Sequence, residues 1–275
     1  MIQRIFGIAG YFLGDLMRSF SGAFHVLLAV VFALLFFRDA KPDADYYIIM
    51  VGLYGAIASF LLTLSITTRA NRSENAAWIV RLPSRVEYLA ATVATSLICA
   101  LILQLFVAGL GLRGGINEDL TLARVSEMPP IWISVDILLT VLALHASDLV
   151  TKGWSRVWIF GVLLVLLFGQ SGSDTIANWI STRINQLSFQ LGQQGMTNLA
   201  DPLREAGNWL ALQGGPALEN ALGLIFWPFR AILDGVTASF DRTQALAPAF
   251  LLLYATILFL LAADFFSTKD IQLVE

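Results

Sequence analysis

Charged residues are scarce in this sequence. Asp, Glu, Lys and Arg make up 13% of the 275 residues, whereas soluble domains carry roughly a quarter. Hydrophobic residues make up 57%, and the formal net charge is only −3. This composition excludes an ordinary soluble domain, and the charge is too small to indicate a nucleic-acid partner.

Cysteine and lysine are nearly absent. The single cysteine, Cys99, lies within an apolar run, which excludes a disulfide framework and a cysteine-rich metal site. The two histidines are isolated, so we expect no metal site. None of Lys41, Lys152 and Lys269 stands between a glycine and a Ser or Thr, as a phosphate-binding loop requires. We therefore expect a chain that is not an enzyme, with no catalytic residue and no cofactor of its own.

Long apolar runs dominate the rest of the sequence. About 20 mostly apolar residues cross a bilayer as a helix, because backbone groups in lipid must bond internally. The predicted spans cover residues 21–37, 46–66, 88–112, 131–150, 157–168 and 246–263. The expected fold class is an all-α membrane protein with six transmembrane helices, in which residues 1–275 form one transmembrane domain.

The first 19 residues predict a different kind of helix. Apolar side chains such as Phe12 and Leu16 gather on one face, and Arg4, Asp15 and Arg18 lie opposite. A helix of this kind lies along the membrane interface.

Residues 171–245 predict helices that do not cross. Apolar side chains recur at helical spacing from Ile176 to Leu191, and the apolar run 222–233 is too short for a span. We expect an extracytoplasmic segment with re-entrant or interfacial helices. Phe226 and Trp227 within it are candidates for an outer gate, or equally for an aromatic anchor at the membrane surface.

Some polar residues fall inside the predicted spans. Asp136 is expected to reach the headgroup region, and His145 to form a local hydrogen bond near Asp148. Ser59 and Thr63 in the second span usually indicate helix packing. The alternative is that they line a transport pathway.

The distribution of basic residues predicts the orientation. With six spans both termini share one side, which then carries nine Lys and Arg residues on short segments. The other side carries eight, spread over a greater length. Because Lys and Arg concentrate in short cytoplasmic loops, we expect both termini to be cytoplasmic.

The loop of residues 67–87 is the most informative segment. Residues 74–82 favour a short helix that Pro83 ends, since proline lacks the backbone donor. Ser84 then caps the next helix, with Glu87 as its capping-box partner. The arginines of this basic helix either fix topology and touch lipid headgroups, or dock a cytoplasmic protein.

Arg72 and Glu74, an apolar stretch, and then Leu82-Pro83-Ser84-Arg85 resemble the coupling region of ABC-2 type exporter permeases. The resemblance extends over most of the chain, since that family has an N-terminal interfacial helix, six spans and partly inserted helices before the last span. It implies the transmembrane subunit of an ATP-driven exporter in the plasma membrane. The coupling residues implied are Arg72, Glu74, Arg81, Pro83 and Arg85.

The resemblance also implies partners. ATP and magnesium would bind to a separate cytoplasmic ATPase, and a second permease copy or a related permease would complete the pathway. The alternative function is a structural or assembly subunit of a membrane complex without transport activity. An ion-coupled carrier is disfavoured because no acidic residue is expected clearly in mid-membrane and no inverted repeat is visible.

Overall fold

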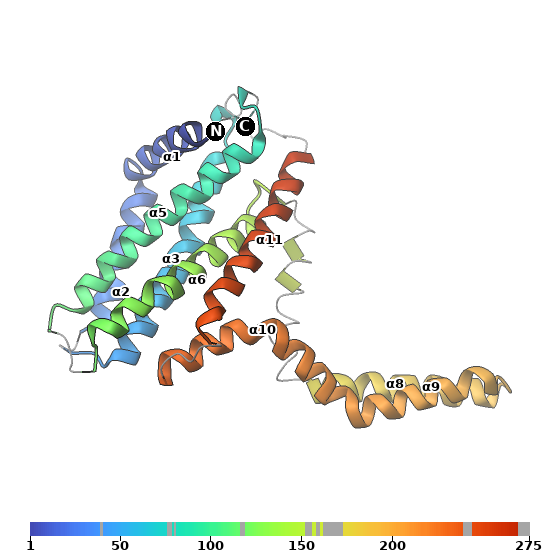
Figure 1. Cartoon of the computed structure of the whole chain (residues 1–275). Coiled ribbons are helices and arrows are strands. Elements are labelled where there is room, and N and C mark those ends of the chain that lie inside the picture. The colour runs from blue at the N-terminus through green and yellow to red at the C-terminus, as the bar shows by residue number, and fades with distance from the viewer. Residues whose placement is uncertain are drawn as a thin grey trace. The chain divides into compact units, whose positions relative to one another are not determined.

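The computed structural model describes residues 1–38, 41–75, 79, 81–115, 119–151, 156–157, 160–161, 173–238 and 244–268. Every regular element in these ranges is helical (Figure 1). The chain forms two compact units, one of residues 1–156 and 231–275 and the other of residues 157–230.

The first unit is a bundle, and the second is built on a helical hairpin. The bundle contains α1 (Ile2–Met17), α2 (Phe20–Phe36), α3 (Ala44–Ala70), α5 (Arg85–Gly111), α6 (Leu122–Ala146) and α11 (Ala247–Thr268), with 3₁₀ turns η1 (Ser73–Asn75) and η3 (Gln244–Leu246). The second unit contains α8 (Ser173–Gln193), α9 (Thr197–Trp209) and the π-helical turn η2 (Leu210–Gly214). It also contains most of α10 (Gly215–Ala238), whose last turns belong to the bundle.

Four bundle helices are long and apolar enough to cross a membrane: α3, α5, α11 and the part of α6 from Met128 to Ala146. Helix α2 makes a fifth crossing when taken with α1, from which it is bent by 75°. The predicted helices at 21–37, 46–66, 88–112 and 246–263 are thereby confirmed. The predicted span 157–168 lies largely outside the described residues.

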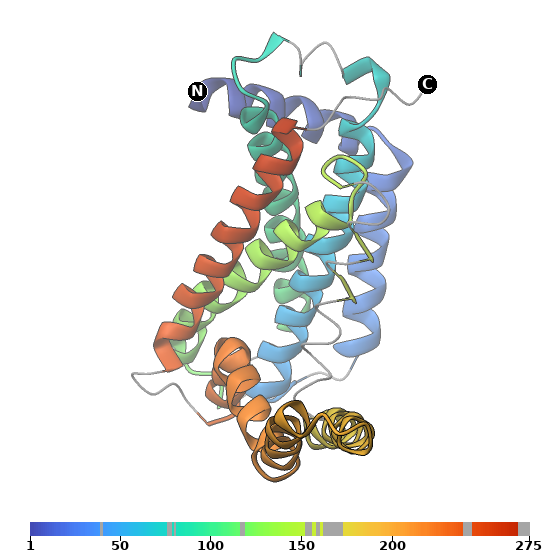
Figure 2. The same ribbon diagram turned by 90° about the vertical axis from the view of Figure 1, so that its right-hand side faces the viewer.

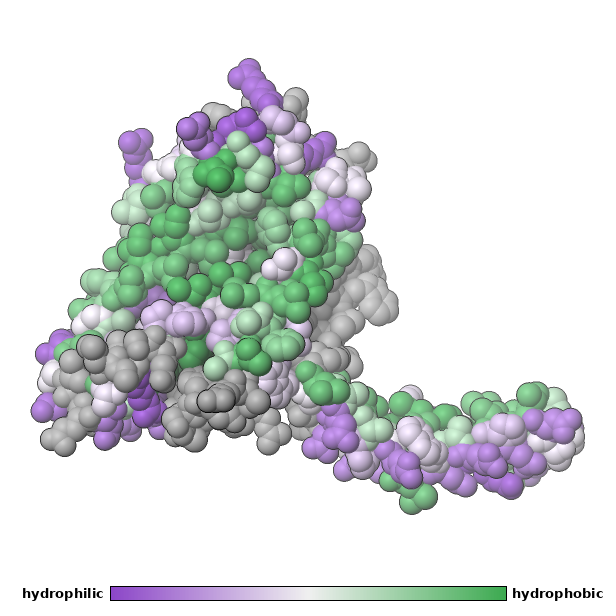
Figure 3. Space-filling model, viewed as in Figure 1, coloured by the Kyte–Doolittle hydropathy of each residue, from purple (hydrophilic) through white to green (hydrophobic). Residues whose placement is uncertain are grey.

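The bundle has its apolar side chains on the outside. Leu35, Leu105 and Leu260 are 70%, 67% and 62% exposed, while the interior holds alanines and hydroxyl residues together with larger side chains such as Tyr54 and Leu62. Figure 3 shows hydrophobic atoms over the flank of the bundle and hydrophilic atoms towards its two ends. Such a surface is stable only against lipid, where helices associate through small and polar contacts. The chain is therefore a multi-pass membrane protein.

Helix α6 differs from its prediction. It begins at Leu122 instead of residue 131, because Thr121 caps it by accepting a hydrogen bond from the Arg124 backbone amide, and Pro129 and Pro130 continue the helix. The earlier start places Asp136 in the middle of the apolar stretch, where it is 0% exposed. The expectation that Asp136 reaches the headgroups is therefore wrong.

The expected pairing of His145 is also wrong. His145 Nε2 lies 3.0 Å from the carbonyl oxygen of Leu258 on α11, whereas exposed Asp148 forms an ion pair with Arg156. The His145 ring also contacts Phe265. These contacts hold the C-terminal part of α6 against that of α11, so the two helices run parallel (Figure 2).

A sharp corner joins α1 to α2. Ser19 caps α2 by accepting a hydrogen bond from the Gly22 amide at 3.2 Å. A Cβ at Gly22 would lie 2.3 Å from the backbone oxygen of Leu16, so only glycine fits there. This corner lets α1 lie across the bundle end while α2 follows α3 (Figure 1).

We expect Gly22→Ala to destabilise the bundle by about 1–3 kcal/mol, because the added methyl group meets backbone that cannot move aside. Gly14→Ala is the matched control, since a methyl group added there would have nothing within 4 Å. Thermal unfolding of the purified protein in detergent measures both variants. Equal melting temperatures would contradict the tight corner.

Candidate functional site

The 67–87 segment joins α3 to α5 at the end of the bundle that also holds α1 (Figure 1). Asn75 closes the first turn by donating from Nδ2 to the carbonyl oxygen of Arg69 at 2.9 Å. The Tyr88 hydroxyl, fully buried at the start of α5, donates to the Ala70 carbonyl oxygen at 2.7 Å. The two ends of the segment are therefore fixed directly to each other.

The predicted coupling residues divide into two groups. Arg72, Glu74, Arg81 and Pro83 are exposed. Arg85 is half-buried, and its guanidinium donates to the Ser267 carbonyl oxygen at the end of α11 at 3.2 Å. Sequence reasoning placed all five on one docking surface, whereas Arg85 also connects α5 to α11.

The helix predicted for residues 74–82 is described only in part. The 3₁₀ turn η1 covers Ser73–Asn75, Ile79 and Arg81 are helical, and the chain bends at residues 82–83. Residues 76–78 and 80 lie outside the described part of the chain. Ser84 caps α5 as predicted, accepting a hydrogen bond from the Val86 amide at 3.2 Å.

Glu87 has a partner that the sequence pattern did not suggest. Both carboxylate oxygens accept hydrogen bonds from the Arg4 guanidinium, each at 2.8 Å. The predicted capping box is therefore half correct, because the carboxylate binds α1. The pKa of Arg4 is raised above its ordinary value, first by the hydrogen bond to Glu87 and then by attraction between the charges.

A second ion pair fixes the other end of α1. Arg69 Nη1, near the end of α3, donates to the Asp15 carboxylate at 2.6 Å. Between the two pairs, Phe12 and Leu16 are buried as predicted, and the Phe12 ring packs edge-on against Tyr88. Helix α1 is thus held to both helices that the 67–87 segment joins.

The predicted pathway or gate residues lie in different units. Ser59 and Thr63 are fully buried on α3, with the Thr63 hydroxyl donating to the Ser59 carbonyl oxygen at 2.6 Å. Phe226 and Trp227 lie on α10 within the second unit, where Phe226 contacts Phe229. The roles of the four residues stay predictions.

The hairpin of α8 and α9 is closed by hydroxyl groups. Ser181 and Ser188 of α8 donate to the carbonyl oxygens of Gly207 and Ala200 at 2.7 and 2.6 Å. The apolar side chains lie beside this seam: Trp179 and Leu187 on α8 are more than half exposed. In Figure 3 hydrophobic atoms follow one edge of the hairpin and hydrophilic atoms the other. The hairpin is therefore amphipathic as a whole.

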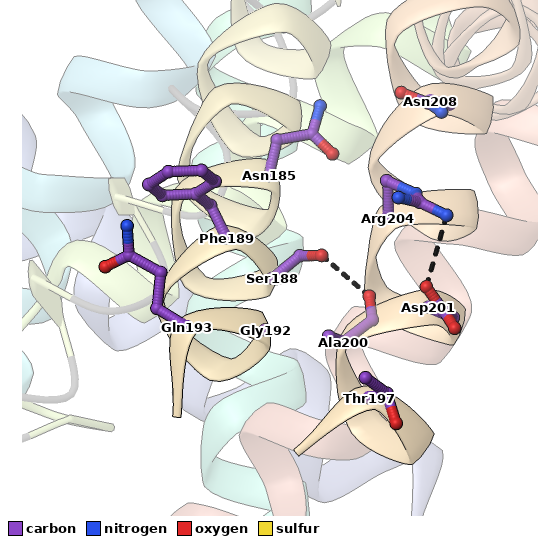
Figure 4. A pocket seen from close by; sticks show the side chains of 10 residues that line it. All are labelled: Asn185, Ser188, Phe189, Gly192, Gln193, Thr197, Ala200, Asp201, Arg204 and Asn208. Carbon is purple, nitrogen blue, oxygen red and sulfur yellow. Dashed lines mark hydrogen bonds and ion pairs between the residues drawn. The ribbon is translucent and has the colours of Figure 1, made fainter. Parts of the chain in front are cut away.

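A shallow groove of about 550 Å³ runs between α8 and α9 (Figure 4). More of its lining surface is apolar than polar, and the polar part includes Asn185, Gln193 and Asn208. Asp201 and Arg204 in the groove pair with each other at 3.1 Å, so they neutralise each other. The groove presents amide and hydroxyl groups to a ligand.

Within the described part of the chain, no three His, Cys, Asp or Glu side chains are placed to hold a metal ion. No family model, curated protein or solved structure matches the sequence. The residues and contacts of the chain itself are therefore what indicate its function.

We expect Arg4→Met to lower the melting temperature, because Glu87 is 6% exposed and would be left charged without its partner. Gln3→Met, on the neighbouring exposed residue, is the control and should have little effect. The double variant Arg4→Met/Glu87→Gln should melt no lower than Arg4→Met alone, because the stranded charge is gone. Additive losses would show that the pair does not act as a unit.

Proposed function

We propose that this chain is the transmembrane subunit of an ATP-driven exporter of the ABC-2 type in the plasma membrane. In this proposal the 67–87 segment faces the cytoplasm and docks a separate ATPase. The observation that carries the proposal is the connection of this segment to four helices: α3, α5, α1 and α11. A loop that served only as a linker would not need these contacts.

The contacts of the 67–87 segment would allow its movement to be passed on to several helices. Asn75 and Tyr88 tie the segment to the end of α3, Arg85 ties the start of α5 to α11, and Glu87 ties it to α1. The exposed side chains of Arg72, Glu74 and Arg81 are free to meet a partner, and arginine pairs bidentately with carboxylates. Movement of a docked ATPase would therefore displace several helices together.

The exporter needs a partner to bind ATP and magnesium, since the sequence offers no phosphate-binding loop. Two permease chains with two ATPase subunits would form the complete transporter, with the pathway between the permeases. Alternating access requires each state to be stabilised by different contacts, and nucleotide-dependent closure of the ATPases would supply them.

The number of spans proposed is six. Helices α6 and α11 run in the same direction in Figure 2 and touch through His145 and Leu258. If both cross the membrane, an odd number of crossings between them would fit this arrangement. The apolar residues 157–168 are the natural crossing, and with α2 they bring the total to six. Both termini then lie on one side, which the basic residues assign to the cytoplasm.

The α8–α9 hairpin is proposed to lie in the membrane interface on the extracytoplasmic side. Its hydroxyl seam leaves the apolar edge without a protein partner within the hairpin, and flanking spans keep it at the bilayer. Trp179, with the Arg183 guanidinium 5.8 Å from its ring centroid, suits the headgroup region.

The alternative is a structural or assembly subunit whose 67–87 segment docks a protein that is not an ATPase. The exposed arginines favour a docked partner in either case. The two functions differ in whether the partner carries a phosphate-binding loop.

We expect the affinity-purified protein to recover an ATPase, and Arg72→Glu/Arg81→Glu to lose it, because both exposed charges are reversed at the docking surface. Arg85 is left unchanged because a substitution there would also remove its hydrogen bond to Ser267. A loss of docking could then not be separated from a loss of folding. Arg38→Glu/Lys41→Glu is the matched control, with the same charge change on two exposed residues at the opposite end of the bundle.

Mass spectrometry of the recovered proteins and ATPase activity measure the outcome. Recovery of a partner without a phosphate-binding loop would favour the assembly subunit. Equal recovery of the ATPase by both double variants would exclude the 67–87 segment as its docking surface.

For the hairpin we expect Leu187→Cys to resist a membrane-impermeant maleimide in intact cells while Thr182→Cys reacts, in a Cys99→Ala background. Both side chains are exposed in the isolated chain, so only lipid or a partner can protect one of them. Labelling after detergent solubilisation is the control and should reach both. Equal labelling in cells would contradict an interfacial hairpin.

A further inference from the structure

A polar cluster lies inside the bundle among α3, α5 and α6, away from the 67–87 segment. It consists of Ser59, Gln104, Asp136 and Thr140, all 2% exposed or less. Gly55 makes room for it: a Cβ there would lie 2.1 Å from Gln104 Nε2 and 2.8 Å from Asp136 Oδ1. The carboxylate and the amide therefore meet against bare backbone of α3.

Only the amide of this cluster has an assigned hydrogen bond. Gln104 Nε2 donates to the Val51 carbonyl oxygen at 3.3 Å. The Ser59 hydroxyl faces the Asp136 carboxylate, and within the described residues neither carboxylate oxygen nor the Thr140 hydroxyl has another hydrogen-bond partner. Buried polar groups without partners are rare and costly in proteins.

The Asp136 carboxylate, at 0% exposure inside a membrane bundle, is stable at this position only if its charge is paired or neutralised. The described arginines of α3, α5 and α6 are at helix ends, where Arg69, Arg85 and Arg124 bind Asp15, the Ser267 carbonyl and Asp45. They leave Asp136 without a cationic side chain.

We propose that Asp136 is a proton-binding site, occupied as the neutral carboxylic acid while the bundle is closed. Protonation forms an O–H bond on one carboxylate oxygen, with the proton taken from water when the cluster is open to it. The protonated Asp136 side chain can then donate a hydrogen bond, whereas the ionised carboxylate can only accept one. The hydroxyls of Ser59 and Thr140 are the available acceptors in the cluster.

The donor set favours a proton over a metal cation. Sodium or calcium needs several oxygen ligands at once, and calcium takes 6–8. The cluster supplies one carboxylate, two hydroxyls and one amide. A proton needs only the carboxylate and a neighbouring acceptor.

The titratable and charged groups on the helices packed against Asp136 do not substitute for it. They are Asp45, Tyr46, Tyr47, Tyr54 and Arg69 on α3, Arg85, Glu87, Tyr88 and Cys99 on α5, Arg124, Glu127 and His145 on α6, and Tyr254 and Asp264 on α11. Tyrosine and cysteine ordinarily titrate in the alkaline range. His145 is nine residues along α6 and contacts α11. Asp136 is thus the acidic group at the centre of the bundle.

Infrared spectroscopy of the wild-type protein tests the proposal without any ATPase. At neutral pH the spectrum should contain a carboxylic acid C=O band that shifts with [4-¹³C]aspartate and is absent from Asp136→Asn. Asp264→Asn, which removes an exposed carboxylate of α11, should leave the band unchanged. A neutral-pH spectrum with no aspartic acid band would overturn the proposal, and this readout holds even if the Asn variant does not fold.

The pH dependence of the folding equilibrium, measured across about pH 5–9, gives the second readout. The folded state keeps a proton that an unfolded aspartate, which titrates near 3.9, has already released. The wild-type folding constant should therefore fall by up to about tenfold per pH unit as pH rises, until the folded protein also loses the proton. Asp136→Asn should lack this component. If sodium or potassium at fixed pH stabilises the wild type but not Asp136→Asn, the site binds a metal cation and the proposal is wrong.

Discussion

The bilayer imposes the constraint on which this structure depends. Lipid offers no hydrogen bonds, so each crossing must be helical, and it offers no hydrophobic gain for burying leucine between helices. The chain has an apolar exterior, and its interior mixes large apolar side chains with many small and hydroxyl residues. Thr92 and Ser96 on α5 each donate to a carbonyl oxygen one turn earlier, which satisfies them without a partner helix, and Thr95 does the same while also lying 3.3 Å from the Ala9 carbonyl oxygen of α1. Helices can then approach closely through small side chains.

Between helices that pack this closely, two ion pairs fix the position of α1. The ion pairs of Arg4 with Glu87 and of Arg69 with Asp15 lie at the ends of α1, where the spans leave the apolar layer. Together they bind α1 to the two helices that the 67–87 segment connects. A partner docked on this segment would therefore act on a braced end of the bundle.

The sequence predicted most of the architecture and less of the site. Hydropathy located α2, α3, α5 and α11 because a long apolar run has few alternatives in a helix. It placed the start of α6 at residue 131, because the apolar run begins there, whereas the helix itself begins at Leu122 with Thr121 as its cap. The partners of Glu87 and His145 were missed for a different reason. Each bonds to a residue more than 80 positions away, and spacing along one helix cannot reveal such a contact.

Helix α3 connects the two places where polar chemistry gathers. Its C-terminal end carries Arg69 and accepts the Tyr88 hydroxyl at Ala70, while Ser59 faces the Asp136 cluster. Eleven residues separate Ala70 from Ser59, or about 16 Å along a helix. Because a helix of this length moves as a stiff body, a tilt at the braced end shifts Gly55 and Ser59 relative to α6. Since Gly55 leaves no side chain between α3 and the carboxylate, even a small shift changes the contacts of Asp136.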